Sequence, residues 1–108
     1  MTGENRIKRD ICDFLKASGA LIFTHDSVGI FDPIRRVYRA NRDPFRRKGV
    51  SDLLGIWRGR FLAIEVKTLK PKKYPSKEQR QFLKDVADAG GIAVLARSVE
   101  DVRKALEI

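Results

Sequence analysis

Three residues in the middle of the chain have the types and spacing of a metal-dependent hydrolytic centre: Asp52, Glu65 and Lys67. Carboxylates are hard oxygen ligands that suit Mg²⁺, which usually takes only one or two of them from a protein and keeps waters for a substrate phosphate. A lysine next to such an ion can orient the attacking water or neutralise charge on a phosphate. Because Glu65 and Lys67 are two residues apart, they share one face of a strand. The three residues therefore predict a nuclease centre that binds Mg²⁺.

The segments on either side of these residues predict a β-hairpin that brings the two carboxylates together. Apolar runs of strand length occupy residues 53–57 and 61–66, and a glycine-containing turn between two such runs is typical of a hairpin. A turn at residues 58–59 places Asp52 directly opposite Glu65, with Cβ atoms about 4.5–5.5 Å apart. Two like charges in that position destabilise a hairpin, and a cation between them reverses the effect.

An ordinary surface hairpin is the alternative interpretation of the same residues. Leu62, Ile64 and Val66 would then form its buried face, with Glu65 and Lys67 in solvent. A glutamate two residues before a lysine is common and indicates little alone. The opposed aspartate, the turn and the apolar runs add weight to a site, but spacing alone leaves both interpretations open.

The composition predicts one domain over residues 1–108 and excludes several kinds of site. Cys12 is the only cysteine, which excludes an internal disulfide and fits a reducing compartment. His25 is the only histidine, which excludes a Cys/His zinc site, and no nucleophile-elbow motif supports a Ser-His-Asp triad. The sequence has neither a transmembrane-length apolar run nor the apolar core of a signal peptide. We therefore expect a cytoplasmic protein that is not secreted, with no membrane partner and no organic cofactor.

The net charge of +9 and the pI of about 10.1 predict a polyanionic partner, most simply nucleic acid. Acidic protein partners are the alternative, but the positive charges cluster in two segments beside the proposed site. The candidate nucleic-acid-binding residues are Arg35, Arg36, Arg39, Arg46, Arg47 and Lys48 in the first segment, and Lys70, Lys72 and Lys73 in the second. Such side chains grip phosphates.

The segment 27–48 is the least regular part of the sequence, with Gly29, Pro33 and Pro44 as breakers. Residues 35–40 are a candidate strand or hairpin within it. Its aromatic residues could stack on unpaired bases, although pinning the segment to the core is the favoured interpretation. These aromatics are Phe31, Tyr38 and Phe45. Just before the segment, His25 and Asp26 are expected to be structural or rim residues rather than metal ligands.

Periodicity predicts the remaining elements. A helix is expected over residues 4–18, with an apolar stripe at helical spacing, and a short apolar strand over 20–25. A second helix over 76–89 precedes a continuous apolar run, 92–96, typical of a strand buried on both faces. A last helix begins at Ser98. The order α-β-β-β-α-β-α predicts an α/β fold, a small mixed sheet of about four strands flanked by helices.

Two polar residues on the predicted helices have both a structural and a functional interpretation. Glu4 lies three residues before Ile7, at the edge of the buried face. It is either a first-turn acid favoured by the helix dipole or a further carboxylate aimed at the metal. Ser76 and Gln79 match a capping box, yet Gln79 also lies three residues before Phe82 and therefore faces the sheet.

This order of elements, with Asp52 and then Ile64-Glu65-Val66-Lys67, resembles the PD-(D/E)XK nuclease superfamily, although Ser51 replaces the proline of its name. More narrowly, the chain resembles the VRR-NUC (virus-type replication-repair nuclease) family from Glu4 to its end, least over 27–48. The motifs that carry this resemblance are Gly49-Val50-Ser51-Asp52-Leu53-Leu54-Gly55, Ala63-Ile64-Glu65-Val66-Lys67, Ser76-Lys77-Glu78-Gln79-Arg80-Gln81-Phe82-Leu83 and Gly90-Gly91-Ile92-Ala93-Val94.

The resemblance implies a role for each candidate site residue. Asp52, Glu65 and the backbone carbonyl of Val66 would bind Mg²⁺ or Mn²⁺, and Lys67 would position the attacking water. Glu4 would assist at the metal and Gln79 would hold the geometry of the site.

The resemblance also implies a substrate and an assembly. Stand-alone members are similar to Holliday-junction resolvases that act as homodimers, so we expect an endonuclease for branched or flapped DNA with a place in DNA repair. A nicking or sequence-specific duplex endonuclease and an idle DNA-binding module are the alternatives.

Overall fold

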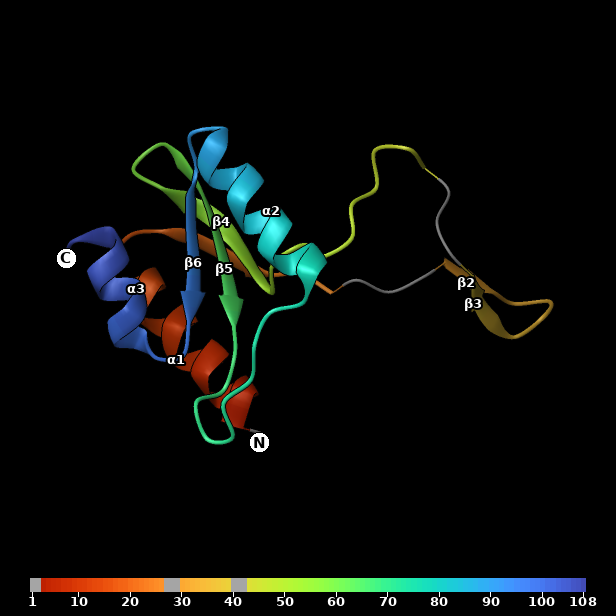
Figure 1. The fold of residues 1–108 in the computed structure, drawn as a ribbon, viewed down its shortest axis with the longest axis horizontal. Helices are drawn as coiled ribbons and strands as arrows, with labels where there is room; N and C mark the ends of the chain where they lie inside the picture. The colour runs from red at the N-terminus through yellow and green to blue at the C-terminus, as the bar shows by residue number, and fades with distance from the viewer. Residues whose placement is uncertain (1–2, 27–29, 40–42) are drawn as a thin grey trace.

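The computed structural model describes residues 3–26, 30–39 and 43–108 of the chain. Its elements are α1 (Gly3–Ala17), β1 (Leu21–Thr24), β2 (Ile30–Asp32), β3 (Val37–Arg39), β4 (Leu53–Trp57), β5 (Arg60–Val66), α2 (Lys77–Asp88), β6 (Ile92–Ala96) and α3 (Val99–Leu106). Within these ranges no helix is long and apolar enough to cross a membrane. A four-stranded mixed sheet with helices on both sides confirms the predicted α/β fold (Figure 1).

The hairpin of β4 and β5 has the predicted turn and register. Residues 58 and 59 have φ angles of 48° and 80°, and a two-residue turn of type I′ requires positive φ at both positions. The antiparallel pairing ends at Leu53 opposite Ile64. The next step of this register places Asp52 opposite Glu65. The predicted register is therefore confirmed as far as Leu53 and Ile64, the residues next to the two carboxylates.

The four-stranded sheet has the order β1-β4-β5-β6. β4 pairs antiparallel with β1 and with β5, whereas β6 pairs parallel with β5. The parallel pair requires a crossover connection, which α2 supplies. Figure 1 shows α1 and α3 on one side of the sheet and α2 on the other. The end of β5 and the first turns of α1 and α2 lie at the same end of the molecule, where the site residues gather.

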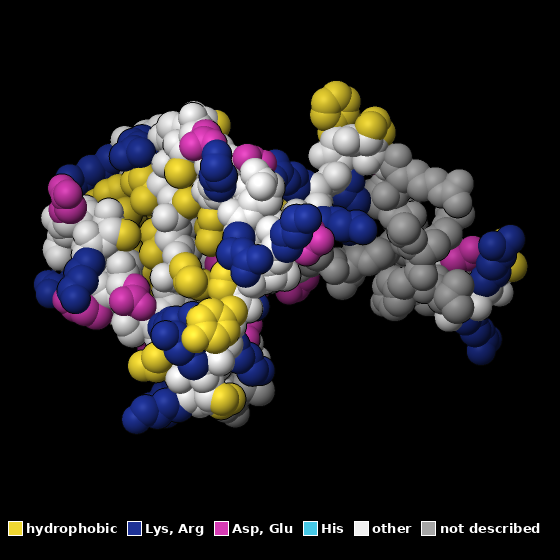
Figure 2. Space-filling model, viewed as in Figure 1, with side chains coloured by type: hydrophobic (Ala, Val, Ile, Leu, Met, Phe, Trp, Pro, Cys, Tyr) yellow, Lys and Arg dark blue, Asp and Glu magenta, His cyan; other side chains and the backbone are white. Residues whose placement is uncertain are grey.

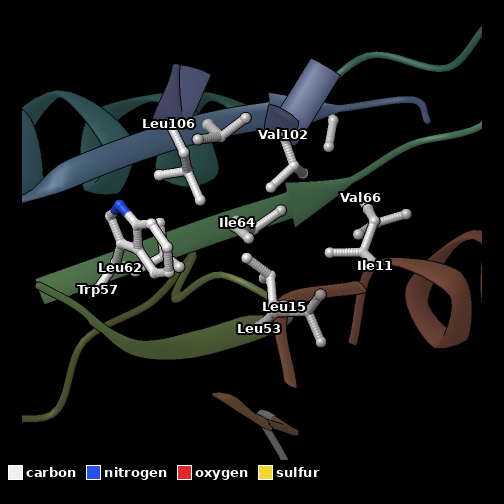
Figure 3. Close-up of a cluster of buried hydrophobic side chains, with 11 residues drawn as sticks. Ile11, Leu15, Leu53, Trp57, Leu62, Ile64, Val66, Val102 and Leu106 are labelled. Atoms are coloured by element: carbon white, nitrogen blue, oxygen red, sulfur yellow. The ribbon is translucent and has the colours of Figure 1, made fainter. Parts of the chain in front are cut away.

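The hydrophobic core lies between the sheet and the pair of helices α1 and α3. Figure 3 shows side chains from β4 and β5 pointing toward these helices. The largest fully buried members are Ile11 and Leu15 of α1, Leu53 of β4, Leu62, Ile64 and Val66 of β5, and Val102 of α3. Each such side chain contributes about 1.5–3 kcal/mol on burial. This packing holds the β4–β5 hairpin in place.

The opposite face of the sheet is only partly covered, because α2 packs mainly on β5 and β6. Leu21, Phe23, Ile56 and Phe61 on this face are 59%, 50%, 46% and 43% exposed. The prediction that β6 is buried on both faces is wrong, since Leu95 is 36% exposed. β6 is an edge strand, and a side chain there has strand neighbours on one side only.

The segment predicted to be irregular contains a second, two-stranded sheet. β2 and β3 pair antiparallel and share no pairing with the main sheet, and Figure 1 shows them apart from it. The candidate strand at 35–40 is therefore β3, which is shorter and belongs to a hairpin, while residue 40 lies outside the described ranges. The side chains of Phe31 and Tyr38 also lie outside the description, whereas Phe45 is 94% exposed and is not pinned to the core.

Candidate active site

Asp52 occupies the position just before β4, where it faces the end of β5. Its Oδ2 accepts a hydrogen bond of 3.0 Å from the backbone N–H of Val66. A second bond fixes the backbone here, because the N–H of His25 donates to the carbonyl oxygen of Asp52 at 2.8 Å. The carboxylate is therefore held from the end of β5 and the backbone of Asp52 from the end of β1, while the side chain remains 22% exposed. Asp52 can thus reach a ligand without leaving its position.

Glu65 is a buried acid on the α2 face of β5, with only 1% of its surface exposed. Its Oε1 accepts a hydrogen bond of 2.8 Å from Nε2 of Gln79 and lies 3.7 Å from Nζ of Lys67. Its Oε2 has no hydrogen-bond partner among the described residues. Buried carboxylate oxygens normally have partners, so this oxygen has capacity for a further ligand.

The electrostatics of Glu65 follow from its position. Burial raises its pKa, the nearby Asp52 carboxylate raises it further, and Lys67 opposes both effects, so that the pKa of Glu65 is about 7. Two carboxylates in one site cannot both ionise easily without a cation. A strongly raised pKa in a buried acid of a cleft is typical of functional sites. The surface-hairpin interpretation, with Glu65 in solvent, is wrong because α2 covers this position.

Gln79 completes the predicted capping box and also contacts the buried acid Glu65. Its backbone N–H donates to Oγ of Ser76, and its Oε1 accepts from the backbone N–H of Ser76, which completes the capping box of α2. Its remaining Nε2 donates to Glu65. The amide thus joins the start of α2 to the buried acid. Gly49 allows this approach, because a Cβ at that position would lie only 2.3 Å from the backbone of Glu78.

A lysine that the sequence reasoning missed lies between two of the predicted acids. Nζ of Lys8 is 3.4 Å from Oε1 of Glu4 and 3.6 Å from Oδ1 of Asp52. Glu4 therefore approaches the centre through Lys8 rather than through a direct contact with Asp52. The i,i+4 spacing of Glu4 and Lys8 on α1 predicts their pairing. Only the packing of α1 against the sheet brings Asp52 to the same lysine.

A cleft of about 320 Å³ opens beside Asp52. Its walls come from the end of β1, the segment before β4 and the first turn of α2. His25 and Asp26 line this cleft, and the expectation that they are structural or rim residues rather than metal ligands stays a prediction. Nδ1 of His25 is buried and has no hydrogen-bond partner among the described residues. Among the predicted DNA-binding residues, Lys48 lines the cleft.

The donor set suits one hard cation. Asp52 and Glu65 offer two carboxylates with a free buried oxygen, which matches the one or two protein ligands that Mg²⁺ usually takes. Over the described residues, no group of three or more His, Cys, Asp or Glu side chains could hold a metal ion. Glu4 is therefore not gathered with the other two acids into one ligand set. For Val66, the structure gives a bond from its N–H to Asp52, and the predicted use of its carbonyl stays a prediction.

The predicted DNA-binding residues of the first basic segment lie in different settings. Arg35 and Arg36 are exposed in the turn between β2 and β3, whereas the side chain of Arg39 lies outside the described part. Arg47 is paired with Asp85 and lies over the ring of Phe82, at 5.4 Å from its centroid.

The second basic segment follows β5, and Figure 2 shows its dark blue side chains at the bottom of the view. Lys70, Lys72 and Lys73 are exposed. Arg97 holds this loop, because its Nη1 donates to the carbonyl oxygens of Thr68 and Lys73 at 2.8 and 2.5 Å. The loop after β5 therefore presents its lysines to solvent from a fixed base.

Arg46, in the first basic segment, is exposed, and its backbone N–H donates to the carbonyl oxygen of Asp43 at 3.0 Å.

The geometry thus brings together Asp52, Glu65, Lys67 and Gln79, with Glu4 one contact further away. No protein-family model matches the chain, and no curated protein matches it either.

Proposed function

We propose that this chain is a metal-dependent deoxyribonuclease that hydrolyses phosphodiester bonds in branched or otherwise structured DNA. The observation that carries the proposal is the state of Glu65: a fully buried acid beside a second acid and a lysine, with one oxygen unpartnered among the described residues. Burying an ionisable group without a partner costs stability. A ligand for that oxygen explains why the position is occupied by an acid rather than by another apolar residue.

The chemistry follows from the roles that the side chains can take. Asp52 and Glu65 would hold Mg²⁺ or Mn²⁺, which supplies a Lewis acid for the phosphoryl oxygens and the leaving group. Lys67, whose side chain is 16% exposed, reaches the same carboxylate and can orient the attacking water. The water oxygen forms a bond to phosphorus and loses a proton to solvent, while the bond to the 3′-oxygen breaks and that oxygen takes a proton from solvent to become a hydroxyl. Gln79 holds Glu65 in place, and the resemblance implies a 5′-phosphate product.

The surface charge supports DNA as the substrate. The chain carries a net charge of +9, and exposed lysines follow directly after the strand that bears Glu65 and Lys67. One small domain covers little DNA, so two copies related by a two-fold axis would allow paired cuts. A second copy is also a natural cover for the bare apolar side chains of β1, β4 and β5, because these are uncharged and do not attract phosphates.

The test is a panel of DNA substrates incubated with the purified chain. Junction, flap, nicked and plain duplex DNA are compared with and without Mg²⁺ or Mn²⁺, and the wild type is compared with Asp52→Ala. We expect metal-dependent cutting of branched DNA that falls by about a thousandfold or more in the variant, with DNA binding retained. A sequence-specific cut on plain duplex would select the restriction-type alternative. Binding to DNA without any cleavage would identify an idle binding module.

A further inference from the structure

Among the described residues, Lys8 is the one cation that contacts two of the site's acids, Glu4 on its own helix and Asp52 beside the sheet. It extends from α1 to Glu4 at 3.4 Å and to Asp52 at 3.6 Å. Its side chain is 25% exposed, so the contact is partly protected from water. The ammonium therefore occupies the space between these two carboxylates, on the opposite side of Asp52 from Val66.

Lys8 keeps its charge in this position. A lysine ammonium is charged at neutral pH, and the carboxylates of Asp52 and Glu4 on either side of it favour the charged form. A permanently charged ammonium between two carboxylates takes the place that a divalent cation would take in a two-metal site. The two ions of such a site lie about 3.5–4 Å from each other.

The balance of charge points the same way. When ionised, Glu4, Asp52 and Glu65 carry three negative charges, and Lys8 and Lys67 carry two positive charges. One divalent cation changes this group from a net charge of minus one to plus one. A second ion would have to enter a group that is already positive, at a place where Lys8 repels it directly. Without Lys8, one ion leaves the group neutral and the position beside Glu4 is open.

We propose that Lys8 is a positioning residue that limits this centre to a single divalent cation. It occupies the Glu4–Asp52 pair and leaves the Asp52–Glu65 pair for the metal. The proposal rests on the proposed function, since it assumes that Asp52 and Glu65 bind a cation. It also assigns Glu4 a role: this acid holds Lys8 and does not ligate the catalytic ion.

The test is the number of Mn²⁺ ions bound per chain, measured by electron paramagnetic resonance and by calorimetric titration without DNA. We expect one ion in the wild type and two in Lys8→Ala, with the spectrum of a spin-coupled pair. Lys8→Arg retains the charge and should bind one ion. The double variant Glu4→Gln/Lys8→Ala should also bind one, because the second ion has lost its ligand. Lys16→Ala, at the other end of α1, is the control for the loss of one positive charge.

The outcomes separate the two proposals. One ion in the wild type and one in Lys8→Ala would overturn the role of Lys8 and leave the metal site intact. No ion in the wild type would overturn the proposed function and this inference with it. A second ion that persists after Glu4→Gln would show that the extra site lies elsewhere, and would likewise overturn the role of Lys8. Thermal unfolding followed by circular dichroism establishes that each variant is folded, and Lys8→Gln replaces Lys8→Ala if the alanine variant is not.

Discussion

Ile64 and Glu65 are neighbours on β5, equally buried, and placed on opposite faces of the sheet. Ile64 is 0% exposed among side chains of α1 and α3, whereas Glu65 is 1% exposed against α2. Burial of the isoleucine removes apolar surface from water and stabilises the fold. Burial of the glutamate disfavours its charged form and raises its pKa to about 7. One face of the sheet thus maintains the fold, and the other tolerates a destabilising group at the place where a ligand can bind.

The two faces also differ in how completely they are covered. Two helices cover the Ile64 face, and one helix covers only part of the Glu65 face. The exposed apolar residues of β1, β4 and β5 all lie on the second face. If the two faces differ in this way, substitutions on them should change different properties, and neighbouring residues of β5 provide matched pairs.

The largest effect on stability is expected on the core face. Ile64→Ala removes a fully buried side chain and leaves a cavity, which should lower the free energy of unfolding by about 2–5 kcal/mol. Urea denaturation followed by circular dichroism measures this change. A loss below about 1 kcal/mol would mean that the packing between β5 and the helices α1 and α3 is not the core of the fold.

The second prediction concerns the pH dependence that Glu65 adds to stability. Since the folded-state pKa is about 7 and the ordinary value is 4.5, the folded state binds the extra proton between these values. Stability should therefore be highest below about pH 4.5 with respect to this group, fall as the pH rises, and become constant above about pH 7. The full shift corresponds to at most about 3 kcal/mol.

Glu65→Gln should remove this dependence. The variant should be more stable than the wild type at pH 8, by up to about 3 kcal/mol, and the two should converge near pH 4. Urea denaturation across this pH range, in a chelator, gives the comparison. Parallel stability curves for the two proteins would contradict the raised pKa and, with it, the contrast between the faces.

A smaller effect is expected where α2 supports the acid. Gln79→Ala removes the bond to Glu65 and half of the capping box. Loss of a group that orients a metal ligand typically weakens metal binding by about tenfold to a hundredfold, and the lost cap should destabilise α2 by about 1 kcal/mol. Mn²⁺ titration and thermal unfolding measure the two effects. Gln81→Ala is the control on the same helix. Equal metal affinities for the two variants would mean that Gln79 serves only as part of the helix cap.

The smallest effect on stability is expected at the bare part of the second face. Phe61→Ser changes a residue that is 43% exposed, so the free energy of unfolding should fall by less than about 1 kcal/mol when measured on dilute protein. If a second copy covers this face, the same variant should weaken dimerisation in sedimentation experiments. A loss of stability as large as that of Ile64→Ala would mean that both faces belong to one core.

Much of the site could be predicted from the sequence, because the residues that define its geometry lie close together in the chain. The turn at residues 58–59 sets the register of β4 against β5, and the register places Asp52 opposite Glu65. The capping box of Ser76 and Gln79 is also a matter of spacing. In these cases a few consecutive residues define the geometry. Periodicity likewise predicted the helices and the order in which helices and main strands follow one another along the chain.

The burial of individual strand residues could not be predicted from the sequence in the same way. The apolar run of β6 predicted burial on both faces, and Leu95 is exposed because β6 is an edge strand. Position in a sheet depends on which strands pair, which apolar composition alone does not encode. The hairpin of β2 and β3 was expected only as a candidate strand or hairpin within residues 35–40, and β2 was not predicted, since arginines and prolines obscure the alternation.

The sequence by itself determined the hairpin, its opposed carboxylates and the cap that Gln79 completes, because each depends on contacts between residues close in the chain or on a register set by one turn. Only the tertiary structure decided that Glu65 is buried under α2 and that Lys8 lies between Glu4 and Asp52. These contacts join α1 and α2 to the sheet. They depend on how helices pack against strands, which is set by the whole core rather than by any local pattern.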